Sequence, residues 1–134
     1  MEDRRILIDT SIVIDYLRSH NRKETFFIKL FVSNELCLSV ISIFELYNGA
    51  TTQEKKQEII TLSQEIEVID FTIETAKMAS EIYHDLRRKN KLIEFRDILI
   101  ASTAVQFDIK IATINRKHFE RIANLDIINL NDLY

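Results

Sequence analysis

Ile6-Leu7-Ile8-Asp9-Thr10-Ser11 is the stretch from which the fold class of this chain can be inferred. Three large apolar residues in succession, two of them β-branched, predict a strand that is buried on both faces. The Asp-Thr-Ser that follows supplies residue types that begin helices well. A carboxylate, that of Asp9, therefore stands where a central strand ends. In an open parallel α/β sheet this edge is where ligands bind, because the connecting loops diverge there.

The rest of the chain alternates strand patterns with helix patterns. Four further apolar runs predict strands at 36–41, 65–71, 109–113 and 126–130, the last of them a short edge strand. Apolar residues at helical spacing predict helices at 11–18, 24–32, 42–49, 53–64 and 97–107, with a turn and short helix at 114–119. The longest predicted helix is capped by Thr72 and ends in the basic run 87–91. This alternation predicts an α/β domain in which helices flank a mainly parallel sheet of about five strands.

Length and composition indicate one globular domain, 1–134, with a core of its own. No apolar run approaches the roughly 18 residues of a membrane span, and the charged start leaves no room for a signal peptide, so we expect a cytoplasmic protein. The single cysteine, Cys37, excludes an internal disulfide. The formal charge of −3 provides no overall attraction to nucleic acid. A polyanionic partner must therefore be bound locally, by clustered bases or by metal ions.

Four polar side chains follow predicted strands or begin a buried helix. Asp9 follows the first strand, Glu45 lies in the first turn after the second, Asp97 begins the apolar helix, and Asn115 follows the fourth strand. Because the carboxyl ends of parallel strands meet at one edge of a sheet, we expect these side chains to converge. Three converging carboxylates repel one another unless a cation neutralises them. Oxygen ligands favour Mg²⁺ or Mn²⁺ over zinc.

Other chemistries fit the sequence less well. His20, His84 and His118 are scattered and lack the spacing of zinc ligands. We expect His118 on a solvated helix face; the alternative is that it approaches the site, since it lies three residues after Asn115. One glycine excludes a Gly-rich phosphate loop, and no serine lies in a G-x-S-x-G motif. A phosphoaspartyl phosphatase would have a second aspartate at position 11, where this chain has Ser11.

Each candidate also has a purely structural interpretation. Asp9 would end a strand, Asp97 would complement a helix N-terminus, and Asn115 would be a turn residue. The strongest alternative concerns Glu45, since Ser42-x-x-Glu45 fits the capping box, in which the glutamate bonds back to the cap residue.

Four segments in order resemble the motifs of PIN-domain nucleases, especially the VapC-type toxins of toxin–antitoxin pairs: 7–17, 42–46, 96–101 and 112–119. The resemblance covers nearly the whole chain. It implies a PIN-like three-layer sandwich and Mg²⁺- or Mn²⁺-dependent endonucleolytic cleavage of RNA. Asp9, Glu45 and Asp97 would then be the catalytic and metal-binding acids. Asn115 stands where an aspartate is frequent, so it would be a weaker ligand or a water-orienting group, and occupancy by a second metal is open.

The resemblance further implies a homodimer and a small VapB-like antitoxin whose tail covers the site. Among the basic residues, Arg96 and Arg116 adjoin proposed site residues, and Arg87 and Arg88 lie in the basic run 87–91. All four are candidates to hold RNA phosphates, and a solvated surface is the alternative.

Two other functions fit the same residues. A catalytically silent PIN-like module would use the acids only as caps and salt bridges, and it predicts no stabilisation by Mn²⁺. A DNA-directed nuclease is not distinguished from a ribonuclease by the sequence.

Overall fold

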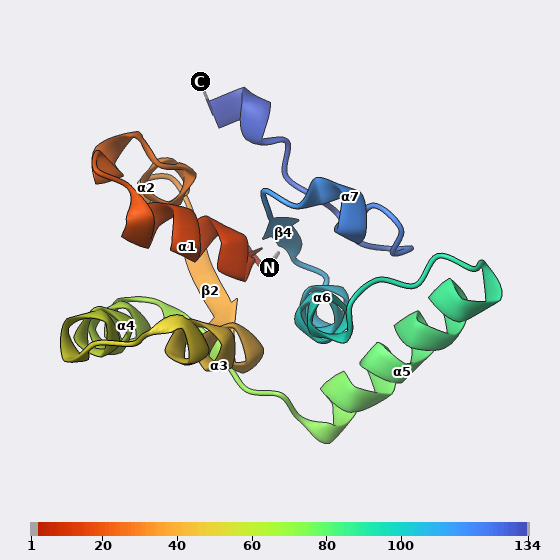
Figure 1. Ribbon diagram of the computed structural model, residues 1–134. Helices are drawn as coiled ribbons and strands as arrows, with labels where there is room; N and C mark the ends of the chain where they lie inside the picture. The colour runs from red at the N-terminus through yellow and green to blue at the C-terminus, as the bar shows by residue number, and fades with distance from the viewer. Residues whose placement is uncertain (1–2, 134) are drawn as a thin grey trace.

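A four-stranded parallel sheet lies between two layers of helices in the computed structural model, which describes residues 3–133 (Figure 1). The strands are β1 (Arg5–Ile8), β2 (Glu35–Ser39), β3 (Glu67–Ile69) and β4 (Lys110–Ala112). Their order across the sheet is β3-β2-β1-β4, and every hydrogen-bonded pair is parallel. β1 is therefore a central strand, and its carboxyl end lies between those of β2 and β4.

The helices connect the strands and form the two outer layers. They are α1 (Thr10–Arg18), α2 (Phe26–Phe31), α3 (Val40–Gly49), α4 (Gln53–Glu65), α5 (Ile73–Arg88), α6 (Phe95–Phe107) and α7 (Arg116–Phe119), with 3₁₀ helices at Arg22–Glu24 and Leu130–Leu133. Helices α1 to α4 pack on one face and α5 to α7 on the other. The predicted three-layer α/β sandwich is confirmed. None of the described helices combines the length and apolar character needed to cross a bilayer.

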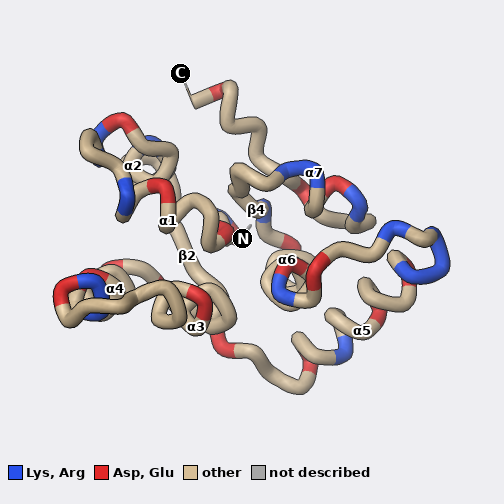
Figure 2. The backbone as a smooth tube through the Cα atoms, in the orientation of Figure 1, with Lys and Arg blue, Asp and Glu red and all other residues tan. Residues whose placement is uncertain are grey.

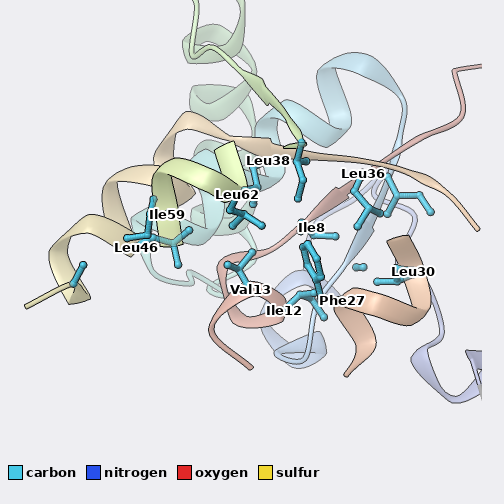
Figure 3. Close-up of a cluster of buried hydrophobic side chains, with 14 residues drawn as sticks. Ile8, Ile12, Val13, Phe27, Leu30, Leu36, Leu38, Leu46, Ile59 and Leu62 are labelled. Atoms are coloured by element: carbon cyan, nitrogen blue, oxygen red, sulfur yellow. The ribbon is translucent and has the colours of Figure 1, made fainter. Parts of the chain in front are cut away.

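Successive residues of β1 belong to different halves of the core. Ile6 and Ile8 pack with the α1–α4 layer, where Ile12, Val13 and Leu38 are also fully or almost fully buried (Figure 3). Leu7 points to the other face and packs among residues of α5 and α6. This explains why the strand is apolar without alternation. Each fully buried aliphatic side chain contributes about 1.5–3 kcal/mol to stability.

Cys37 lies on β2 and is fully buried. Burial raises the pKa of its thiol to about 12, so the thiol stays protonated at neutral pH. The residue acts as a small hydrophobic side chain of the core.

Some boundaries differ from those predicted. The edge strand predicted at 126–130 is reduced to a single bridge between Ile111 of β4 and Ile127, and the chain turns into a 3₁₀ helix at Leu130. The helix expected from residue 24 starts at Phe26, since Thr25 is extended with φ −78° and ψ 155°. The other helices and strands lie within a few residues of their predicted positions.

Thr103 on α6 provides a test of the packing. Its side chain is fully buried, and its hydroxyl has no hydrogen-bond partner among the described residues. Thr103→Val replaces that hydroxyl by a methyl group of similar size. We expect the free energy of unfolding to rise by about 1 kcal/mol, because an unsatisfied polar atom leaves the core. Chemical denaturation measures this, and a loss of stability would show that the hydroxyl has a partner in solution.

Candidate active site

Asp9 is the most buried of the candidate acids, with 3% of its surface exposed. It is the N-cap of α1, and its Oδ1 accepts a hydrogen bond from the backbone N–H of Thr10 at 2.8 Å. Its Oδ2 accepts from the hydroxyls of Ser11 and Thr113, both at 2.8 Å. A carboxylate this deeply buried is stable only with such partners. The three donors hold it at the carboxyl end of β1.

The same two hydroxyls connect Asp9 to the segment after β4. Ser11 Oγ accepts from the backbone N–H of Ile114 at 3.1 Å, and Thr113 Oγ1 accepts from that of Asn115 at 2.9 Å. Asn115 itself is exposed and precedes α7 without a capping hydrogen bond from its side chain. The structure thus brings the backbone of Asn115 to the Asp9 edge through Thr113.

Glu45 reaches the same edge from α3. Its Oε1 lies 3.0 Å from Thr10 Oγ1, and its Oε2 lies 3.4 Å from Arg96 Nη1. The side chain is 17% exposed. Burial raises the pKa of Glu45, the hydrogen bond from Thr10 and the charge of Arg96 oppose this rise, and the charges of Asp9 and Asp97 add to it. The carboxylate is therefore held between a buried hydroxyl and an exposed guanidinium.

The capping-box interpretation of Glu45 is wrong. Helix α3 begins at Val40, and its N-cap is Ser39, whose hydroxyl accepts from the backbone N–H of Ile41 at 3.1 Å. Ser42 is fully buried inside the helix, with its Oγ 2.8 Å from Thr10 Oγ1. Glu45 consequently lies beyond the first turn of α3, where it has no capping role.

Asp97 lies in the first turn of α6 and its side chain is 14% exposed. Its Oδ2 is 3.0 Å from Nδ1 of His118. Burial raises the pKa of Asp97, contact with His118 opposes the rise, and the charge of Asp9 adds to it. His118 is exposed, as predicted, and the alternative is also confirmed, because its ring contacts the acid. The neighbouring Phe119 could have indicated this contact from the sequence. It is buried and fixes which face of α7 packs on α6, the helix that carries Asp97.

The carboxylates share this edge, since Thr10 bonds to both Asp9 and Glu45, and the charge of Asp9 raises the pKa of Glu45 and of Asp97. Within residues 3–133, no three His, Cys, Asp or Glu side chains are arranged to hold a metal ion as they stand. Each acid instead has protein partners: hydroxyls on Asp9, Arg96 on Glu45 and His118 on Asp97. A divalent cation bound by these acids would have to displace the Arg96 guanidinium from Glu45 and the His118 ring from Asp97.

The candidate RNA-binding bases are exposed. Arg96 also bonds to Glu94, and Arg88 and Arg116 pair with acidic neighbours on their own chain segments. Figure 2 shows Lys and Arg gathered where α5 connects to α6, the segment that contains Arg87 and Arg88, and on α7. Exposed ion pairs of this kind are worth little. The side chains can therefore exchange their partners for phosphate groups at small cost.

A pocket of about 170 Å³ lies between α1, α3 and α4. Its apolar lining includes Ile14, Leu17, Leu46 and Ile59, and Glu45 is also among the lining residues. The pocket is therefore continuous with the acidic edge, and it offers an apolar surface directly beside it.

Comparison with known proteins identifies the family. The family model described as PIN domain matches residues 6–125. The chain is 30% identical over 121 residues to Ribonuclease VapC1 of Methanocaldococcus jannaschii, covering 90% of this chain and 83% of that protein. It is 30% identical over 129 residues to Ribonuclease VapC2 of Rickettsia felis, covering 92% and 96%.

A solved structure has the same fold over nearly the whole chain. This is the crystal structure of VapBC2 from Rickettsia felis bound to a DNA fragment from its promoter. The TM-score is 0.82 and the sequence identity is 26%. The superposition covers 93% of this chain and 98% of that one. With the match over residues 6–125, these similarities establish that the chain belongs to the PIN-domain family, among its VapC members.

Proposed function

We propose that this protein is a metal-dependent endoribonuclease, the VapC-like toxin of a toxin–antitoxin pair. The observation that carries the proposal is the set of three interacting carboxylates, Asp9, Glu45 and Asp97, at the carboxyl edge of a parallel sheet. Its relatives of similar length are named ribonucleases, which favours RNA over DNA as the substrate.

PIN-domain ribonucleases generally depend on a divalent metal, and we propose Mg²⁺ or Mn²⁺ here. Asp9, Asp97 and Glu45 would hold the ion. These three residues fit such an ion, because carboxylate oxygens are the ligands that Mg²⁺ and Mn²⁺ prefer. The Arg96 guanidinium beside Glu45 shows that a positive charge is already accommodated at this carboxylate. When bound, such an ion stabilises charge on the phosphoryl oxygens and favours ionisation of a nucleophilic water.

The side chains of the site have distinct proposed roles in phosphodiester hydrolysis. Glu45 has a raised pKa, which suits a carboxylate that accepts a proton from the attacking water. Asn115 would orient water or act as a weaker ligand, since its backbone is tied to Asp9 through Thr113. Asp9 and Asp97 would be metal ligands.

RNA would be held by basic side chains around this edge. Arg96 and Arg116 would contact phosphates next to the scissile one, and Arg87 and Arg88 would contact phosphates farther along the strand. Local contacts are needed because the formal charge of the whole chain is −3.

The proposed partners are a VapB-like antitoxin and a second copy of this chain. The Rickettsia felis neighbour is a structure of VapBC2, which supports an antitoxin partner. The apolar pocket lined by Leu17, Leu46 and Ile59 would accept apolar side chains of the antitoxin tail where it passes Glu45. We further propose that residues 1–134 form one domain that acts in the cytoplasm, where its RNA substrate occurs.

Cleavage of end-labelled RNA with and without divalent metal tests this function. We expect cleavage in Mg²⁺ or Mn²⁺, none in EDTA, and recovery when excess Mn²⁺ is added back. Mn²⁺ at about 100 times its Kd should also stabilise the fold by about 2.7 kcal/mol. DNA of the same sequence serves as the control substrate. Undiminished cleavage in EDTA would refute metal dependence, and an absence of both cleavage and stabilisation would favour a silent interaction module.

A further inference from the structure

Thr10 contacts two of the three carboxylates. Its backbone N–H donates to Asp9 Oδ1 at 2.8 Å, and its hydroxyl donates to Glu45 Oε1 at 3.0 Å. The residue is only 4% exposed, so water does not compete for these bonds. Glu45 lies on a different helix, 35 positions later in the chain. Thr10 therefore links the start of α1 to the acid that α3 contributes.

The hydroxyl of Thr10 belongs to a short buried chain of hydrogen bonds. Its Oγ1 lies 2.8 Å from Oγ of Ser42, which is fully buried. A hydroxyl has one proton to donate, and an ionised carboxylate can only accept. The Thr10 hydroxyl is placed to donate either to Oγ of Ser42 or to Oε1 of Glu45, and its single proton is bound more strongly by the charged carboxylate. With the proton turned toward Ser42, Glu45 Oε1 would lose its buried donor.

The other oxygen of Glu45 is bound from the solvent side. Arg96 Nη1 lies 3.4 Å from Oε2, and the Arg96 side chain is 59% exposed and also bonds to Glu94 at 2.6 Å. An exposed arginine of this kind is a weak and mobile restraint. The Glu45 side chain has several rotatable bonds, and ordering it costs entropy. Among residues 3–133, only the Thr10 hydroxyl holds this carboxylate from the buried side.

We propose that Thr10 is a positioning residue, whose hydroxyl fixes the Glu45 carboxylate beside Asp9 and thereby sets the affinity of the site for a divalent cation. The inference rests on the metal site of the proposed function and assigns a role to a residue that is not itself an acid. Outer partners that orient metal ligands have comparable effects in other proteins.

Two substitutions at one position separate the hydroxyl from the shape of the side chain. Thr10→Val keeps the branched shape and removes the hydroxyl, whereas Thr10→Ser keeps the hydroxyl. The readout is the Kd for Mn²⁺ alone, measured by calorimetry on the full chain without RNA. We expect Thr10→Val to raise this Kd by about 10–100-fold and Thr10→Ser to stay close to the parent. Thr103→Val is the matched control, because it removes a buried hydroxyl that has no described partner.

A double-mutant cycle tests whether Thr10 acts through Glu45. In a Glu45→Gln background, Thr10→Val should leave the Kd for Mn²⁺ unchanged. Crystal structures of the metal-free variants should show the Glu45 carboxylate retained in Thr10→Ser and released in Thr10→Val. If Thr10→Val does not fold, Thr10→Ala replaces it in the same comparison.

The proposal is overturned if Thr10→Val binds Mn²⁺ as tightly as the parent, or if it weakens binding equally in the Glu45→Gln background. Failure of the proposed function has a different signature. A parent protein that binds Mn²⁺ but cuts no RNA would refute the nuclease and leave the comparison of Kd values intact. A parent protein that binds no Mn²⁺ would refute both.

Discussion

Asp97→Asn is expected to lower RNA cleavage by at least about 100-fold while leaving the protein folded. Asparagine has the size of aspartate and retains an oxygen that can meet Nδ1 of His118, now 3.0 Å from the carboxylate. It lacks the charge that a divalent ion requires. The measurement is kcat/KM on labelled RNA in Mn²⁺, with circular dichroism to establish folding.

The same substitution, although it lowers cleavage, should leave the stability of the metal-free protein unchanged or increase it. The pKa of Asp97 is raised above its ordinary value of 3.8, mainly by burial, so the folded state binds this proton more tightly than the unfolded chain does. The parent therefore loses stability as the pH rises from about 3.8 through the raised pKa. Asp97→Asn avoids that loss, and in EDTA its Tm at neutral pH should equal or exceed the parent's.

Asp108→Asn is the matched control for Asp97→Asn. Asp108 is exposed, and its φ of 52° is one that asparagine tolerates. It should cut RNA at the parent rate. Cleavage by Asp97→Asn at the parent rate would show that Asp97 is not part of the active site. If Asp97→Asn is unfolded, its loss of activity is caused by the loss of the fold and not by the loss of a catalytic group.

Glu45→Gln is expected to reduce cleavage by a similar factor, at least about 100-fold, and to weaken Mn²⁺ binding. Glutamine still presents an oxygen to the Thr10 hydroxyl, so the buried hydrogen bond survives. What disappears is the charge, and with it the ability to bind a cation or take a proton from water. The Kd for Mn²⁺ and kcat are both measured, since either role of the carboxylate predicts a loss of kcat.

Metal-free Glu45→Gln should be as stable as the parent or more stable. The pKa of Glu45 is raised above its ordinary value of 4.5, mainly by burial, so the ionised parent loses stability as the pH rises through this range. The lost contact with Arg96 is partly exposed and costs little. Glu81→Gln, at an exposed position of α5, is the control. Cleavage and Mn²⁺ binding by Glu45→Gln at parent levels would reduce the site to two aspartates.

The sheet edge and its acids were predictable because they depend on local sequence and on one general rule. Ile6-Leu7-Ile8 had to be buried on both faces, and such a strand belongs in the middle of a parallel sheet. Parallel strands end at one edge, so residues that follow different strands come together there. Asp9 and Glu45 reached the predicted edge for this reason, and Asp97 reached it at the start of a helix that is apolar almost all round.

Contacts between side chains on different elements could not be predicted in this way. Ser42-x-x-Glu45 fits a capping box by spacing alone, yet the helix begins earlier because Ser39 caps it. His118 has the spacing of a surface residue, yet the packing of α7 on α6 brings it to Asp97. The segment 126–130 has the pattern of a strand, yet it forms only one bridge to β4 among the described residues. In each case the outcome depends on where a second element lies.

The local sequence was thus sufficient for the four strands of the sheet, the approximate positions of the main helices, the fold class and the sheet edge that carries the acids, because periodicity and burial are properties of short segments. It was not sufficient for the partner of each acid. Thr10 and Glu45 are 35 positions apart, and their hydrogen bond exists only because α1 and α3 pack side by side against the sheet. A hydrogen bond requires atoms within about 3 Å of each other, and such positions are determined only by the packing of the whole chain.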